Sequence, residues 1–160
     1  MPRIASLVNG ALLLAFGAAL ASPVYAAGPF ATLDGAWRGG GSVTLLGGQT
    51  ERLACKAYYN TKDGGAGLGL AISCASPSNK FELRANLKSN GSNVTGSWEE
   101  RAFNSTGDVT GKASDSAINL SISGTLQATM SIRFASGSQS VSISTDGTGF
   151  KSVNLTLSRI

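Results

Sequence analysis

Apolar and polar residues alternate with a period of two along most of the chain, as in strands that bury one face. In the segment 80–88, Phe81, Leu83, Ala85 and Leu87 share one face, and polar or charged residues occupy the other. The same alternation covers 42–46, 51–59, 67–75, 92–100, 107–113, 116–123 and 126–134, and then the stretches around 141–143 and 153–157. We therefore expect about ten short strands and no long helix.

The connections between these segments carry turn residues, as in Asp63-Gly64-Gly65, Ser89-Asn90-Gly91, Ser136-Gly137 and Asp146-Gly147. Such short loops join neighbouring antiparallel strands. The pattern predicts an all-β protein, an antiparallel up-and-down β-barrel of about 8–10 short strands, because closure leaves no exposed sheet edge. A β-sandwich is the competing architecture, but it needs longer crossovers. A membrane barrel would turn its apolar face outward, and the short strands with their Ser, Thr, Asn and Lys face disfavour it.

Two glycine stretches, Gly39-Gly40-Gly41 and Gly64-Gly65-Ala66-Gly67, invite comparison with phosphate-binding loops. Neither is followed by Lys-Ser/Thr, and each precedes a predicted strand where a phosphate site needs a helix. We interpret both stretches as turn and bulge glycines.

The first residues have the composition of a secretory signal peptide. Arg3 supplies a positive charge, Ile4 to Leu20 is apolar or small, and Val24-Tyr25-Ala26 fits a cleavage site. The expected organisation is a signal peptide at 1–26, an N-terminal tail at 27–34 and a β-barrel domain at 35–160. The apolar run is short for a bilayer span, so we expect a periplasmic or secreted protein that is not membrane-embedded.

The amino-acid composition excludes several kinds of catalytic and metal site. The 160 residues include no histidine, which removes the Ser-His-Asp triad, the Cys-His pair and HExxH zinc sites. We therefore predict that the protein is not an enzyme and uses no cofactor and no metal. The 13 Lys and Arg residues are spread among 9 Asp and Glu residues, so no clustered surface for nucleic acid is expected.

The two cysteines, Cys55 and Cys74, are equidistant from the turn at Gly64 and Gly65. Residues placed in this way face each other across a hairpin, close enough for a disulfide. An exported protein folds in an oxidising compartment, so we predict one disulfide within this hairpin.

The segment Leu33-Asp34-Gly35-Ala36-Trp37 resembles the Gly-x-Trp opening of calycin-type barrels, namely lipocalins, avidins and small bacterial metalloprotease inhibitors. The resemblance implies that Gly35 and Trp37 lie at the closed end of the barrel and that Arg159, after the last strand, packs across the Trp37 ring. The chain lacks the C-terminal helix of lipocalins and the many tryptophans of avidins. The segment Leu70–Phe81 also resembles small exported proteins of soil proteobacteria, which implies no function.

The period-two alternation places four residues of interest on the apolar side of their strands, namely Trp98, Tyr59, Phe81 and Glu100. We hypothesise that the three aromatic residues line an interior pocket for a small apolar or amphipathic ligand, with Glu100 near the mouth. In the alternative, purely structural interpretation, the same side chains only fill the core. The alternative function is a protein-binding envelope module or a protease-inhibitor-like barrel that uses its loops or N-terminal tail. In either case we expect a monomer or small oligomer.

Overall fold

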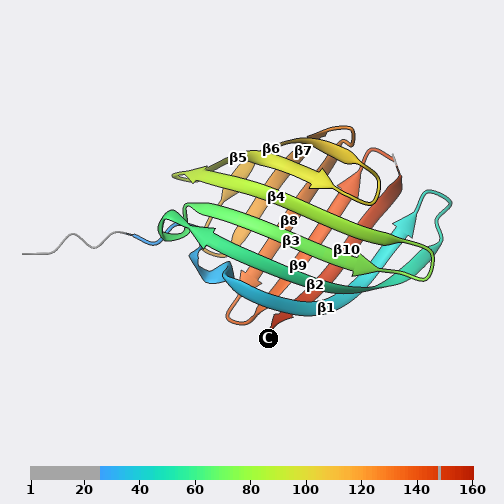
Figure 1. The fold of residues 1–160 in the computed structure, drawn as a ribbon, viewed down its shortest axis with the longest axis horizontal. Coiled ribbons are helices and arrows are strands. Elements are labelled where there is room, and N and C mark those ends of the chain that lie inside the picture. Colours follow the sequence, from blue (N-terminus) through green and yellow to red (C-terminus); the bar gives the residue numbers. More distant parts are fainter. Residues whose placement is uncertain (1–25, 148) are drawn as a thin grey trace, which may run out of the picture.

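The computed structural model describes residues 26–147 and 149–160, which form a closed antiparallel barrel of ten strands (Figure 1). The strands are β1 (Gly35–Leu45), β2 (Thr50–Lys62), β3 (Gly67–Ala75), β4 (Lys80–Asn90), β5 (Asn93–Glu100), β6 (Ser105–Ala113), β7 (Ala117–Gly124), β8 (Ala128–Ala135), β9 (Ser138–Thr145) and β10 (Phe150–Arg159). Each pairs with the next, and β1 pairs with β10 to close the barrel. The predicted all-β, up-and-down barrel is confirmed, and the sandwich alternative is wrong.

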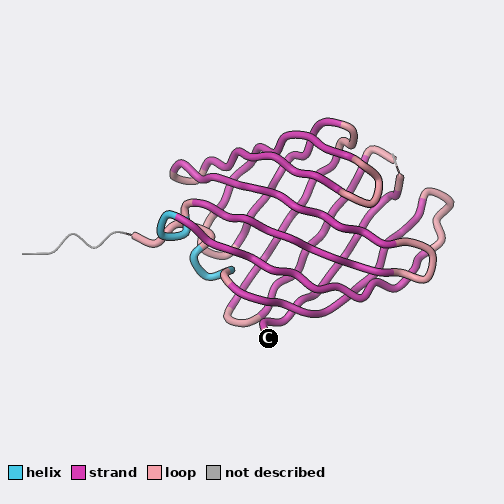
Figure 2. The backbone as a smooth tube through the Cα atoms, viewed as in Figure 1, coloured by secondary structure: helices cyan, strands magenta, loops and turns pink. Residues whose placement is uncertain are grey.

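The barrel has two different ends. The hairpins that follow the odd-numbered strands lie at one end, whereas the segment before β1 and the β2–β3 connection lie at the other (Figure 1). Two short 3-10 helices occur at this second end, η1 (Ala31–Leu33) and η2 (Asp63–Gly65). Figure 2 shows the strands of the near wall crossing those of the far wall at a steep angle, which follows from strand tilt in a closed barrel. Within the described ranges, no helix has the length and apolar character needed to cross a membrane.

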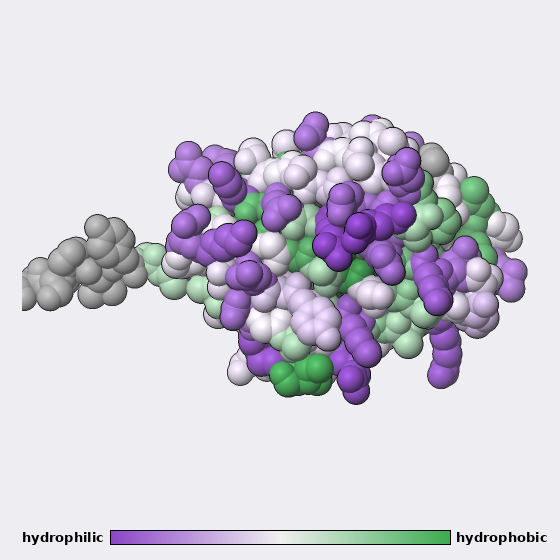
Figure 3. Space-filling model, in the orientation of Figure 1, coloured by the Kyte–Doolittle hydropathy of each residue, from purple (hydrophilic) through white to green (hydrophobic). Residues whose placement is uncertain are grey.

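Side chains alternate between the interior and the surface as the sequence predicts. In β2, Leu53, Cys55, Ala57 and Tyr59 are buried and the residues between them are exposed. Hydrophilic side chains cover much of the near face of the molecule in Figure 3. The buried apolar side chains of all ten strands form one core cluster inside the barrel.

The glycine stretch Gly39-Gly40-Gly41 corrects one expectation, because it lies in the middle of β1 and not in a turn. Its backbone approaches both neighbouring strands very closely. A Cβ at Gly39 would lie 2.0 Å from the carbonyl oxygen of Thr156, and one at Gly41 would lie 1.8 Å from that of Asn154. Glycine is therefore needed at these positions for close strand packing. Because the glycines belong to the strand, β1 begins at Gly35, seven residues before the alternation becomes visible at Ser42.

The disulfide prediction is confirmed. Cys55 and Cys74 are directly opposite each other in the β2–β3 pairing, and their sulfur atoms are bonded. The predicted signal peptide at 1–26 lies almost wholly outside the described residues, which begin at Ala26.

Candidate functional site

The segment before β1 plugs one end of the barrel. Phe30 and Leu33 are fully buried there. The Gly28 and Phe30 N–H groups donate to the carbonyl oxygens of Gly64 and Gly65, at 2.8 and 3.0 Å. Residues 28–33 are therefore packed against the barrel and are not a free tail.

Trp37 and Arg159 lock this plug in place. The Trp37 indole is buried and donates its Nε1–H to the carbonyl oxygen of Leu33 at 2.9 Å. The Arg159 guanidinium lies 4.5 Å from the centre of the Trp37 ring, and its nitrogens donate to the carbonyl oxygens of Thr32 and Asp34. A cation over an indole face and charge-assisted hydrogen bonds are both favourable, so the last strand holds the first turn of the domain.

Tyr59 belongs to this closed end. Its ring packs edge-on against Trp37, with 6.2 Å between ring centres, and its hydroxyl donates to Oε1 of Gln139 at 2.9 Å. Burial raises the pKa of Tyr59 to about 12, and the hydrogen bond between its hydroxyl and Gln139 offsets part of this rise. Sequence parity put Tyr59 correctly inside the barrel, but it does not line the pocket described next.

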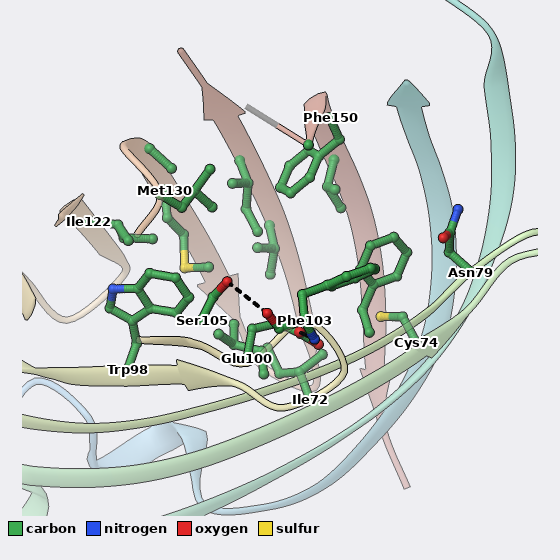
Figure 4. A pocket seen from close by; sticks show the side chains of 18 of the residues that line it. Ile72, Cys74, Asn79, Trp98, Glu100, Phe103, Ser105, Ile122, Met130 and Phe150 are labelled. Atoms are coloured by element: carbon green, nitrogen blue, oxygen red, sulfur yellow. Dashed lines mark hydrogen bonds between the residues drawn. The ribbon is translucent and has the colours of Figure 1, made fainter. Parts of the chain in front are cut away.

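The opposite end of the barrel contains a pocket of about 240 Å³ (Figure 4). Side chains from the middle of the barrel, such as Ile72, Met130 and Leu155, form its deeper wall. Residues from all five hairpins at this end surround its mouth, including Leu45, Asn79, Phe103, Leu126 and Gly149. The barrel is thus filled and plugged at one end and hollow at the other.

Three phenylalanines lie together at the mouth of the pocket. The Phe81 ring centre lies 5.9 Å from that of Phe103 and 6.4 Å from that of Phe150. Phe103 is more than half exposed, whereas Phe81 and Phe150 are partly buried. The three residues come from β4, the β5–β6 loop and β10, so only the closed barrel brings them together. We call this set the phenylalanine cluster.

Trp98 forms part of the pocket wall. Its Nε1–H donates to the carbonyl oxygen of Ser123 at 2.9 Å, which satisfies the polar atom of a nearly buried indole. Trp98 pairs with Gly107 on β6, where a Cβ would lie 2.8 Å from Nε1. Gly107 therefore leaves the space in which the indole lies.

Glu100 contributes a carboxylate to the mouth, beside Phe103 and Ser105 (Figure 4). Its Oε1 accepts a hydrogen bond from the Glu82 N–H at 2.6 Å, and its Oε2 accepts one from the Phe103 N–H at 2.7 Å. These two bonds connect β4 to the β5–β6 loop and hold the carboxylate in one position. Trp98, Phe81 and Glu100 thus meet at one pocket, and their binding role stays a prediction.

A second carboxylate orders the β3–β4 turn at the same end. The hydroxyls of Ser76 and Ser78 donate to Glu51, and these hydrogen bonds lower the pKa of its carboxyl group. Ser76 in turn accepts a hydrogen bond from the N–H of Asn79, the residue of this turn that reaches the pocket. The turn is therefore held by the wall of the barrel.

Two members of the phenylalanine cluster escaped the sequence analysis. Phe103 lies in a loop, where strand parity gives no direction, and Phe150 begins β10 directly after a glycine turn. An aromatic residue adjacent to a turn is the only local signal for either. Among the described residues, no three Cys, Asp or Glu side chains gather into a group that could hold a metal ion.

No protein-family model matches the chain, and no curated protein matches it either. Its fold is similar to that of an S-type phycobiliprotein lyase from Guillardia theta, with a TM-score of 0.53 and 17% sequence identity. The match covers 82% of this chain and 90% of the lyase chain. At this level of identity the likeness shows a shared barrel architecture alone.

The comparison contradicts one prediction from the sequence, namely that the protein is not an enzyme. The neighbour with this barrel fold is a lyase, so a protein of this architecture can be an enzyme. The missing histidine excludes particular catalytic groups and not catalysis as such.

Proposed function

We propose that this protein is an exported barrel that binds a small apolar or amphipathic molecule in the pocket at its open end. The observation that carries the proposal is a hollow of about 240 Å³, walled by apolar side chains and open at its mouth, in a barrel whose other end is plugged. Ligand sites are typically concave, largely apolar and equipped with a few polar groups. Here Glu100, Asn79, Ser105 and Thr125 are the polar residues at the mouth.

The proposal also includes the location of the protein and its assignment to the calycin-type barrels. The signal-like sequence at 1–26 and the Cys55–Cys74 disulfide favour a periplasmic or secreted protein. The calycin-type assignment is supported by Gly35 and Trp37 at the plugged end and by Arg159 across the indole. Calycin-type barrels include ligand carriers, and this agrees with a binding role for the pocket.

The test is to fill the pocket. Ala128 lines it from β8 and is nearly buried, so Ala128→Phe places a ring in the hollow. We expect the wild-type protein to bind the uncharged fluorescent probe N-phenyl-1-naphthylamine and the Ala128→Phe variant to lose at least tenfold in affinity.

The matched control is Ala135→Phe, which makes the same substitution on the outer face of the same strand. This variant should bind the probe as the wild type does, and circular dichroism should show that both variants are folded. Absence of probe binding by the wild type, or equal binding by both variants, would contradict the proposal and favour a barrel that acts through its outer surface.

A further inference from the structure

The charge of the pocket points to a class of ligand. Among the described residues that line it, Glu100 is the sole charged one, and neither Lys nor Arg contributes. The nearby basic residues Lys80, Arg101 and Lys151 are exposed on the outside of the barrel. Arg101 lies 3.8 Å from Glu99, the outward neighbour of Glu100, and no described residue forms an ion pair with Glu100 itself.

The Glu100 carboxylate is fixed but not saturated. Each of its oxygens accepts one backbone N–H, from Glu82 and from Phe103. A carboxylate has about four acceptor positions, so about two of them, and its negative charge, stay available to a cation that enters from the mouth. A bound anion would meet a negative charge here, with no cation of the lining to offset it.

The phenylalanine cluster adds a second feature that favours a cation. Phe103 supplies both an N–H to Glu100 and a ring next to Phe81, so the carboxylate and the aromatic rings meet at the same part of the mouth. Aromatic faces attract ammonium groups, and quaternary ammonium ligands are commonly held among several aromatic rings. A carboxylate beside such rings is suited to the same ligand through its charge.

We propose that the pocket takes an amphipathic cation, with an apolar chain inside the barrel and an ammonium group held at the mouth by Glu100 and the phenylalanine cluster. This inference rests on the proposed function and names the ligand class of the same pocket. The hollow of about 240 Å³ holds roughly eight groups of the size of a water molecule, at about 30 Å³ each. An alkyl chain of roughly that many carbons therefore suits it.

The experiment compares three ligands with one chain and different heads: octyltrimethylammonium, octan-1-ol and octanoate. Each ligand is titrated at neutral pH into wild-type protein that holds N-phenyl-1-naphthylamine, and displacement of the probe gives the affinity of the ligand. We expect octyltrimethylammonium to bind about tenfold more tightly than octan-1-ol, since a cation–π contact and a partly exposed ion pair each contribute a few-fold. Octanoate should be the weakest of the three.

Two pairs of variants identify the residues responsible. Glu100→Gln should weaken octyltrimethylammonium about fivefold and leave octan-1-ol within twofold, whereas Glu99→Gln, the same change one residue away on the outer face, should alter neither. Phe103→Leu should also weaken the cation selectively, by about threefold. Its control, Tyr58→Leu, removes an exposed aromatic ring from the outer wall and should have no effect.

The outcomes separate the two proposals. If octan-1-ol and octanoate bind as tightly as octyltrimethylammonium, or if Glu100→Gln weakens all three ligands equally, the cation preference is wrong and the apolar pocket stands. If none of the three ligands and no probe binds to the wild type, both proposals fail. If Glu100→Gln abolishes octan-1-ol binding while Glu99→Gln does not, the carboxylate only orders the loop. This result too would overturn the inference.

Discussion

Replacing Gly107 with alanine tests how the barrel makes room for the Trp98 indole. A Cβ at this position would lie 1.7 Å from the carbonyl oxygen of Ser123 and 2.8 Å from Nε1 of Trp98, whereas real Cβ contacts stay above 3.0 Å. Strands β6 and β7 must therefore separate locally, and the hydrogen bond from Trp98 to Ser123 must lengthen or break.

The magnitude follows from these two effects. Overpacking typically costs about 1–3 kcal/mol. The lost hydrogen bond adds about 0.5–1.5 kcal/mol. We expect the free energy of unfolding to fall by about 2–4 kcal/mol, which a domain with a total stability of about 5–15 kcal/mol can survive. Because the indole forms part of the pocket wall, binding of the uncharged probe should weaken as well.

Urea denaturation followed by circular dichroism measures the first effect, and the slope of the transition should not change. Gly47→Ala is the control, because a Cβ there meets nothing within 4 Å and Gly47 does not adopt a left-handed φ. Its stability should stay within about 0.5 kcal/mol of the wild type. Equal stability of the two variants would refute the close approach at Gly107.

Three further predictions concern the covalent and polar contacts of the barrel. Unreduced, unfolded protein should yield no free thiol on alkylation, and replacing Cys55 and Cys74 together by alanine should lower the free energy of unfolding by about 3 kcal/mol in denaturant titrations. Tyr59, with its pKa raised from 10.0 to about 12, keeps its proton in the folded state where the unfolded state loses it. The stability it contributes is therefore complete below pH 10.0 and falls as the pH rises toward about 12, by about 2 kcal/mol, and unfolding titrations of Tyr59→Phe should lack this alkaline loss. Arg159→Met keeps apolar cover over Trp37 but removes the charge and the donors, so thermal unfolding should show a loss of about 1–3 kcal/mol, and a loss near zero would mean that only the stem of Arg159 matters.

The wall of the barrel could be predicted from the sequence because strand alternation is local. In β2 the inward positions alternate with more polar ones, so the sequence alone predicts which face of the strand is buried. The symmetry of Cys55 and Cys74 about one turn predicted their pairing for the same reason, since a hairpin relates residues by counting alone.

β1 shows where that logic ends. Gly39-Gly40-Gly41 carries no polarity, and its local sequence is typical of a turn. Its place in a strand depends on the carbonyl oxygens of β10 and β2, which come close only after the barrel has closed.

The pocket likewise depends on the tertiary structure. Parity put Tyr59, Trp98, Phe81 and Glu100 inside, but it contains no information on height along the barrel axis, and so it could not separate the plugged end from the open one. Strand tilt and stagger place Tyr59 against the plug and bring the loop residue Phe103 to the mouth. The sequence alone thus determined which side chains face inward, through a period of two that every strand carries. Only the closed barrel decided which of them pack against one another and which surround a hollow, because that depends on the stagger between strands and on which end the chain itself fills.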